Sequence, residues 1–282
     1  MNGLIVVNKE MGYTSRDVVN ILSKEFKTKK IGQTGTLDPI AEGVLVCVVG
    51  KCTKLCDILT SDEKEYIATM QFGVLTDTLD NTGTILKTCE RKITLKEVKE
   101  ALKEFTKEYV QTVPAFSAVK VNGKKLYDYA RNNISVELPS RKVNIKSIEI
   151  INFENNTLTF KTLVSKGTYI RSLIRDIAEY LNTYGTMTKL IRIKQGEFDI
   201  KDSFNITEIK QGKFKLISID EIFSEYPHIE VDELKLKKTK NGQEFENVLN
   251  SKFIIYTFHN QVIAVYQISQ KDNKKIKPLI LV

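Results

Sequence analysis

The sequence predicts a protein of the α+β class. Strand-like and helix-like segments follow one another irregularly, without the repeated strand–helix–strand rhythm of a doubly wound sheet. Residues 141–164 alternate between apolar and polar side chains, as a β-hairpin does. With 282 residues and 41% hydrophobic content, the chain can bury a large core, and its length favours one sizeable domain plus a smaller one.

The first elements are a strand, a helix and two further strands. The apolar run Leu4–Val7 predicts a strand, and Ser15 is the expected N-cap of the helix that follows. Four apolar side chains share one face of this helix: Val18, Val19, Leu22 and Phe26. Val44–Val49 and Tyr66–Phe72 are then expected to be buried strands.

The middle of the chain carries two clear helix signals and a hairpin. Thr94 and Glu97 form a capping-box pattern that opens a helix. Asn155-Asn156 is the expected turn of the 141–164 hairpin. After a turn at Gly167, a second helix is expected to end before Gly185. Its core side carries Ile170, Leu173, Ile174, Ile177 and Leu181.

The C-terminal part of the chain is expected to form a separate unit. Tyr226-Pro227 marks a boundary, and the residues beyond it include the short strand-like runs Phe253–Phe258 and Val262–Ile268. The sequence has no run of about eighteen apolar residues and no signal-peptide pattern, so we expect a cytoplasmic protein. The spacing of the four cysteines favours reduced thiols over a zinc site, and both histidines lie in the tail.

The net charge of +8 favours a polyanionic partner. Each basic cluster taken alone is more often a solvated face than a phosphate site, but several clusters beside aromatic residues favour a nucleic acid. The clusters are Lys24, Lys27, Lys29 and Lys30; Lys120, Lys124, Lys125 and Arg131; Arg141, Lys142 and Lys146; and Lys189, Arg192 and Lys194. A nucleotide cofactor is not expected, because Gly50-Lys51 lacks the first glycine and the Ser or Thr of a phosphate-binding loop.

Asp38 is the strongest candidate for a catalytic group. It lies in the run Gly-Gln-Thr-Gly-Thr-Leu-Asp-Pro-Ile-Ala-Glu-Gly at residues 32–43, where the following Pro39 disfavours helical geometry at Asp38. Gly32, Gly35 and Gly43 allow a ligand or another backbone segment to come close. On composition alone, an aspartate that simply closes a β-turn would be the simpler interpretation.

The whole run resembles the signature of the TruB family of tRNA pseudouridine synthases, in which such a segment carries the catalytic aspartate. Further motifs of this family follow in order across about residues 3–198. They are Asn8-Lys9 with Gly12–Ser15, Lys64-Glu65-Tyr66, Asp77–Asp80 with Gly83, Pro114–Lys120, Gly123–Tyr127 and Ser165–Arg171.

The resemblance implies a pseudouridine synthase fold with a mixed, mainly antiparallel central sheet flanked by helices. Residues 1–222 would be the catalytic domain, with a thumb-like RNA-gripping insertion at about 107–142. Residues 226–282 would be a small β-rich RNA-binding domain of the PUA type. The family's reaction breaks the N1–C1′ bond of a uridine and joins C5 to C1′, so neither a cofactor nor a metal is expected.

The resemblance also implies roles for individual residues. Asp38 would act as an ionised carboxylate, either on C1′ or on C2′ of the ribose, and both possibilities remain open. Arg171 would supply the cation that keeps it ionised. Without the resemblance, Arg171 and Arg175 would be expected to form a basic, solvent-facing pair. The implied substrate-binding residues are Tyr66, Arg171, Tyr169, Leu190, Lys9 and Gln33, and the implied RNA-binding residues are Lys120, Lys124, Lys125, Arg131 and Arg141.

Simpler alternatives remain for three of these residues. Tyr66 could be an ordinary strand tyrosine, Leu190 a core residue and Lys9 a surface lysine. The sequence departs from the family pattern at Gln33, where histidine is usual, and at Glu10, where proline is usual. Glutamine still forms hydrogen bonds but cannot become charged, so we expect changed pH dependence or affinity rather than lost chemistry.

The implied substrate is the uridine at position 55 in the T-loop of tRNA, and the T-arm stem-loop is the implied partner of a monomeric enzyme. Two alternatives stay open at this point. The chain could be a tRNA-folding factor that grips the T-arm without catalysis, or a pseudouridine synthase that acts on another RNA.

Overall fold

The computed structural model describes residues 1–60 and 63–282 and confirms the α+β class. Nine strands of the described residues form one mixed sheet, whose main path runs β1-β3-β12-β4-β11-β10-β7, with β2 beside β3 and β13 beside β12. The only parallel pairing in it is β12 with β3. The strands are β1 (Gly3–Lys9), β2 (Ile31–Gln33), β3 (Glu42–Val49), β4 (Lys64–Phe72), β7 (Glu108–Thr112), β10 (Ser140–Glu154), β11 (Thr157–Val164), β12 (Gly185–Gln195) and β13 (Phe198–Asp199).

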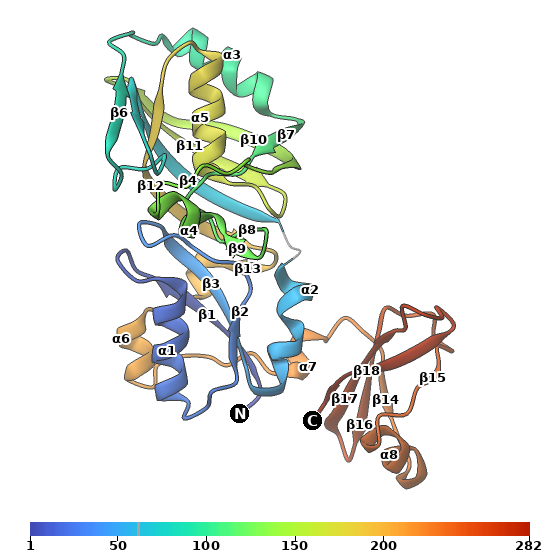
Figure 1. Cartoon of the computed structure of the whole chain (residues 1–282). Helices are drawn as coiled ribbons and strands as arrows, with labels where there is room; N and C mark the ends of the chain where they lie inside the picture. Colours follow the sequence, from blue (N-terminus) through green and yellow to red (C-terminus); the bar gives the residue numbers. More distant parts are fainter. Residues whose placement is uncertain (61–62) are drawn as a thin grey trace.

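Strand β12 joins the two ends of this sheet (Figure 1). It pairs with β4 along most of its length and with β3 at Ile191 and Arg192. Helices α1 (Ser15–Glu25) and α6 (Ile206–Lys210) lie beside β1 and β3 at one end, whereas α3 (Leu95–Phe105) and α5 (Ile170–Tyr180) cover the other. Short helical segments complete this part of the chain: η1 (Gly50–Leu55), α2 (Cys56–Thr60), η2 (Ile200–Asp202) and α7 (Ile219–Ile222).

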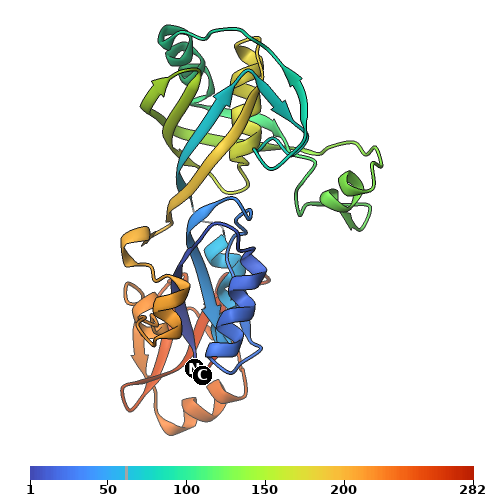
Figure 2. The same ribbon diagram turned by 90° about the vertical axis from the view of Figure 1, so that its left-hand side faces the viewer.

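The insertion expected at about 107–142 is narrower in the structure. Its first and last residues belong to β7 and β10, which pair with each other within the central sheet. Only residues 113–139 leave the sheet, and we call this segment the thumb. It contains β8 (Lys120–Val121), β9 (Lys124–Lys125) and α4 (Leu126–Arg131), and it projects to one side of the molecule (Figure 2). A second small hairpin, β5 (Val74–Thr76) with β6 (Ile85–Thr88), follows β4.

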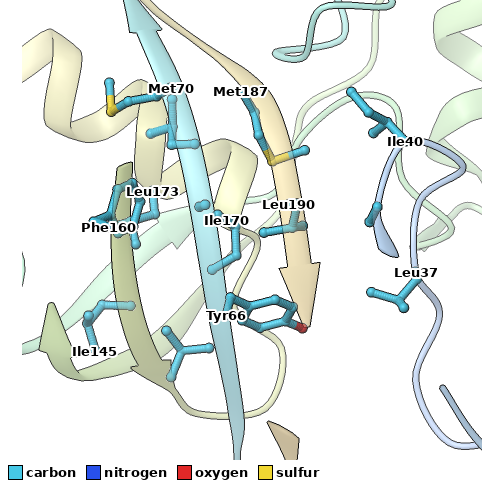
Figure 3. Close-up of a cluster of buried hydrophobic side chains, with 14 of the residues drawn as sticks. Leu37, Ile40, Tyr66, Met70, Ile145, Phe160, Ile170, Leu173, Met187 and Leu190 are labelled. Carbon is cyan, nitrogen blue, oxygen red and sulfur yellow. The ribbon is translucent and has the colours of Figure 1, made fainter. Parts of the chain in front are cut away.

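The main core lies between helix α5 and the strands β4, β11 and β12. Figure 3 shows Met70, Phe160, Leu173 and Met187 within this cluster. The apolar stripe predicted for the helix after Gly167 is confirmed, because its five core-side residues are all buried. Each of these side chains is removed from water, which is the main favourable contribution to folding.

Two of three local sequence signals are confirmed and one is wrong. Thr94 and Glu97 form the expected capping box, and Asn155 and Asn156 both adopt positive φ at the turn between β10 and β11. The N-cap of α1, however, is Thr14 rather than Ser15, because the Thr14 Oγ1 accepts from the amide of Asp17. The side chain of Ser15 is turned inward to a different partner, described below.

The C-terminal residues form their own five-stranded sheet, in the order β14-β16-β17-β18-β15. It consists of β14 (His228–Glu230), β15 (Phe245–Glu246), β16 (Phe253–Phe258), β17 (Gln261–Ile268) and β18 (Lys275–Leu281), with α8 (Glu233–Lys240). The two predicted strand runs correspond to β16 and β17. In the described residues, no helix is long and apolar enough to cross a membrane.

The C-terminal sheet shares a hydrophobic core with the back of β1 and β3. Leu4, Val6 and Val46 point into this shared cluster, while Ile5 and Val7, one step along the strand, point into the main core. Phe253 of β16 and Ile280 of β18 fill it from the C-terminal side. Because β1 and β3 are covered on both faces, their sequences are continuously apolar rather than alternating.

The shared core predicts that the two parts of the chain unfold together. Phe253 is 4% exposed and packs edge-on against the rings of Phe223 and Tyr226. Phe253→Ala is therefore expected to lower the free energy of unfolding by about 3 kcal/mol in a single transition, measured by urea denaturation. Leu249→Ala, at a position that is 48% exposed, is the control. If Phe253→Ala shows two separate unfolding transitions and only one of them shifts to lower urea concentration, the shared core is contradicted.

Candidate active site

Asp38 lies in the loop between β2 and β3, at the junction of the two ends of the sheet. Leu37 and Ile40 on either side of it are buried and anchor the loop, and in Figure 3 they face Tyr66 across the site. The amide of Ala41 donates to the Asp38 carbonyl at 3.0 Å and closes a turn. Asp38 thus belongs to a turn, as in the simpler interpretation, although it opens the turn rather than closing it, and its side chain is 37% exposed at this junction.

Ser15 holds the base of this loop. Its Oγ accepts from the amide of Leu37 at 2.8 Å and donates to the Leu37 carbonyl at 3.1 Å. The residue next to the catalytic candidate is therefore fixed through both of its backbone polar groups. This contact gives Ser15 a function in place of the capping role predicted from sequence.

Arg171 joins Asp38 to three other segments. Its Nε lies 2.9 Å from Asp38 Oδ2, Nη1 donates to the carbonyl of Thr78 at 2.8 Å, and Nη2 donates to the carbonyl of Phe116 at 2.9 Å. Asp80 Oδ2 lies 3.8 Å from Nη1. The Arg171 side chain is only 5% exposed, so the alternative of a solvent-facing basic pair is wrong for this residue.

Asp80 is a site residue that sequence patterns did not single out. It is buried, and its Oδ1 accepts from Thr78 Oγ1 at 2.8 Å, from the Thr82 amide at 3.0 Å and from Thr82 Oγ1 at 2.5 Å. Its other oxygen faces Arg171. The only signal in the sequence was its place in the Asp77–Asp80 motif, because a Thr-rich turn gives no other indication of a buried carboxylate.

The environment of Asp38 shifts its proton affinity. Burial raises the pKa of the Asp38 carboxyl above its usual range, the guanidinium of Arg171 opposes this rise, and the negative charge of Asp80 adds to it. A carboxylate with a raised pKa holds a proton more tightly and is a stronger base than an ordinary aspartate once it is ionised.

Lys9 contacts the same loop through the carbonyl of Pro39 and is not a surface lysine. Its side chain is fully buried, and its Nζ donates to the carbonyls of Tyr13 at 2.7 Å, Glu10 at 3.0 Å and Pro39 at 3.5 Å. Burial is the main reason that the pKa of Lys9 is lowered to about 8. Glu10 stands where the family usually has proline, and its backbone carbonyl still accepts a hydrogen bond from Lys9.

Arg192 is a third buried cation, after Arg171 and Lys9, and sequence patterns placed it only in a basic cluster. Its Nε donates to the Val44 carbonyl at 2.6 Å and its Nη2 to the Gly35 carbonyl at 2.8 Å, so it ties β12 to both ends of the Asp38 loop. A Cβ atom at Gly43 would lie 2.2 Å from the Arg192 carbonyl oxygen. The expected close backbone approach at Gly43 is thus confirmed.

Tyr66 and Leu190 form an apolar wall beside Asp38. They lie on the adjacent strands β4 and β12, and both are buried. In Figure 3 the hydroxyl end of Tyr66 points toward the loop of Leu37. Tyr169 lies at the start of α5, and the guanidinium of Arg141 is 5.3 Å from the centre of its ring.

Gln33 is turned into its own loop. Its Oε1 accepts from the amide of Gly35 at 2.6 Å, and its Nε2 donates to Thr36 Oγ1 at 3.2 Å. In this structure, both ends of the amide are thus occupied by the Asp38 loop.

The expected RNA-binding residues gather mainly on the thumb. Lys120, Lys124 and Arg131 are exposed there, and the charged groups of Lys125 and Arg131 lie 5.2 and 5.3 Å from the centre of the Tyr127 ring. Arg141 lies apart from them, at the start of β10. The thumb therefore presents cations next to an aromatic ring, an arrangement that suits a phosphate backbone.

The fold is that of the pseudouridine synthases. Over 99% of its length, the chain superposes on a chain of a solved Cbf5–Nop10–Gar1 complex, with a TM-score of 0.69 and 21% identity over 83% of that chain. A chain from an archaeal box H/ACA Nop10–Cbf5 complex gives a TM-score of 0.68 at 19% identity, covering 99% of this chain and 84% of that one. The small C-terminal sheet is a curled, PUA-like half-barrel.

Sequence comparison narrows this class to one family. The model described as "TruB family pseudouridylate synthase (N terminal domain)" matches residues 23–170. The tRNA pseudouridine synthase B of Caldanaerobacter subterraneus subsp. tengcongensis is 40% identical over 99% of this chain and 98% of its own. That of Caldicellulosiruptor saccharolyticus is 43% identical over 96% and 92%. The chain belongs to the TruB family and is a pseudouridine synthase, an isomerase.

The geometry of Arg171 predicts that lysine cannot replace it. An ammonium group cannot reach Asp38, Thr78 and Phe116 together, because the planar fork of the guanidinium is needed to span them. Arg171→Lys is expected to lower the single-turnover rate of pseudouridine formation by about 100-fold with little change in RNA affinity. Arg91→Lys, on the surface, is the control. A rate within a few-fold of wild type would contradict this geometry.

The buried Lys9 predicts a characteristic pH dependence of stability. Its folded pKa of about 8 lies below the unfolded value of 10.5, so between these values the unfolded state binds more protons. Its contribution to the free energy of unfolding therefore rises with pH in that window, by at most about 1.4 kcal/mol per pH unit. Urea unfolding of wild type and Lys9→Met should show this rise only in wild type, whereas Lys27→Met should behave as wild type does. An identical pH dependence in Lys9→Met would contradict it.

Proposed function

We propose that this chain isomerises the uridine at position 55 in the T-loop of tRNA to pseudouridine, with Asp38 as the catalytic group. The contact between Asp38 and the buried Arg171 is the observation that carries this proposal. The names of the relatives supply the class of RNA, since both are tRNA pseudouridine synthases B.

Asp38 acts on the ribose in this proposal. As the ionised carboxylate, it either attacks C1′ or removes a proton from C2′, and in both routes the N1–C1′ bond breaks. The freed uracil then turns and C5 bonds to C1′. In the first route the bond between Asp38 and C1′ breaks as this bond forms, and in the second route C2′ regains its proton. The proton on C5 is then lost while N1 gains one. Atoms and electrons balance within the nucleotide, so the reaction needs no redox partner and no donated group.

The wall beside Asp38 suits a planar base. We place the extruded uracil against the ring of Tyr66, with Leu190 and Tyr169 as further contacts. A phenol hydroxyl is a weak base, so Tyr66 would need help from other groups of the site to remove the C5 proton. A base in a folded loop is stacked, and the enzyme therefore has to extrude it before any chemistry occurs.

The remaining contacts are with the RNA backbone. In our proposal, residues 1–222 carry the chemistry, the thumb grips the T-arm through Lys120, Lys124, Lys125 and Arg131, and residues 226–282 add an RNA-binding surface. Arg141, stacked against Tyr169, would hold a phosphate beside the extruded nucleotide. Gln33 would bind the RNA only after its hydrogen bonds to Gly35 and Thr36 are replaced by hydrogen bonds to the RNA.

Mapping the product tests the proposal against both alternatives. A T-arm transcript incubated with the protein, labelled with carbodiimide and copied by reverse transcriptase should show a stop at the T-loop uridine. Tight binding without any stop would indicate a folding factor. Stops on another RNA, with none on the T-arm, would indicate a synthase of different specificity.

The catalytic assignment predicts a separation of binding from turnover. Asp38→Asn keeps the shape of the side chain but removes its charge, so turnover should be abolished while the Kd for the T-arm stays within about twofold of wild type. The exposed Asp202→Asn variant carries the same change in net charge and should remain fully active. Comparable losses of affinity and turnover in Asp38→Asn would mean that the residue is structural.

A further inference from the structure

A chain of partly buried hydrogen bonds connects strand β7 to Tyr169, the residue just before helix α5. Tyr109 OH lies 3.0 Å from Asp176 Oδ2, Gln111 Nε2 lies 2.7 Å from Tyr109 OH, and the amide of Tyr169 lies 2.8 Å from Gln111 Oε1. Gln111 is fully buried. None of these contacts belongs to the regular pairing of the sheet.

Chemistry fixes which group donates and which accepts in each of these hydrogen bonds. An ionised Asp176 can only accept, so the hydroxyl of Tyr109 must donate to it, and the Tyr109 oxygen is left to accept from the Gln111 amide nitrogen. The Gln111 carbonyl oxygen then faces Tyr169. Burial and the neighbouring Asp176 raise the pKa of Tyr109, which keeps its hydroxyl protonated in agreement with this direction.

The end point of the chain lies at the active site. Tyr169 is the N-cap residue of α5 but does not cap it through its side chain, and Arg171 follows two residues later. The next residue of β7, Thr112, accepts from Ser172 Oγ at 2.8 Å. Strand β7 also runs directly into the thumb, whose Phe116 accepts from Arg171.

We propose that Gln111 is a positioning residue for the isomerisation, setting the start of α5 and thereby the placement of Tyr169 and Arg171. The inference rests on the proposed function for its substrate. It adds that this amide, together with the bond from Ser172 to Thr112, aligns the strand that enters the thumb with the helix whose Arg171 contacts Asp38. The carboxylate of Asp176 anchors the far end of the chain and fixes which end of the amide faces the helix.

The test compares two glutamine variants in the full-length protein. Gln111→Leu keeps similar bulk but leaves the Tyr169 amide without its partner. Gln71→Leu is the matched control, because Gln71 on β4 bonds Thr157 and the Phe72 carbonyl in a part of the sheet far from Asp38. Single-turnover rates at saturating T-arm RNA, the Kd for that RNA and the pH dependence of the rate are measured for each.

Gln111→Leu is expected to react at least tenfold more slowly, with a Kd within twofold of wild type. The acidic limb of its pH profile should move to higher pH, because a displaced Arg171 no longer lowers the pKa of Asp38. Gln71→Leu should change neither the rate nor the profile. Equal rates for the two variants, or a loss of affinity that accounts for the loss of rate, would overturn the proposal.

Tyr109→Phe keeps the test decisive if Gln111→Leu does not fold. This variant removes the acceptor of the Gln111 amide, so it should also slow the reaction at unchanged Kd, and the double variant should be no slower than Gln111→Leu alone. Wild-type rates in Tyr109→Phe, or additive losses of rate in the double variant, would refute the proposed role of this series of hydrogen bonds. An inactive wild type would instead count against the proposed function.

Discussion

The proposed active site depends on one buried guanidinium that brings four segments of the chain together. Arg171 holds the carboxylate of Asp38, the turn at Thr78, the base of the thumb at Phe116 and, through its own backbone, helix α5. Burying such a charge costs free energy unless all of its donors find partners. Because these partners come from distant parts of the sequence, the fold has to be complete before the ion pair exists, and the site is then already organised for charge development.

The surrounding architecture keeps this contact in place. Asp38 lies where β12 crosses from one end of the sheet to the other, and Lys9 and Arg192 hold its loop through backbone carbonyls rather than through carboxylates. The C-terminal sheet covers the outer face of β1 and β3, so the strands that lead into the loop are buried on both sides. Rigid packing behind the loop leaves the substrate-facing residues as the part that can adapt.

Much of the fold could be predicted from local patterns, because capping boxes, apolar stripes and the Asn155-Asn156 turn act over a few residues. Strand β12 was not predicted, since bulges near Lys189 and Lys194 break its alternation. Asp80 and Arg192 could not be recognised either, because their roles depend on partners far away in the sequence. The sequence could not distinguish Thr14 from Ser15 as the N-cap of α1, because both residue types can cap a helix. Only tertiary packing brings Ser15 into contact with Leu37.

The most direct test of the proposed isomerisation is tritium release from T-arm RNA that carries 5-tritiated uridine. A carboxylate that severs and remakes the bond between sugar and base must free the hydrogen at C5 as the new bond forms. We therefore expect close to one equivalent of tritium released per RNA in a single turnover, and none when position 55 is cytidine. RNA that binds the protein fully yet retains all of its tritium would contradict this chemistry.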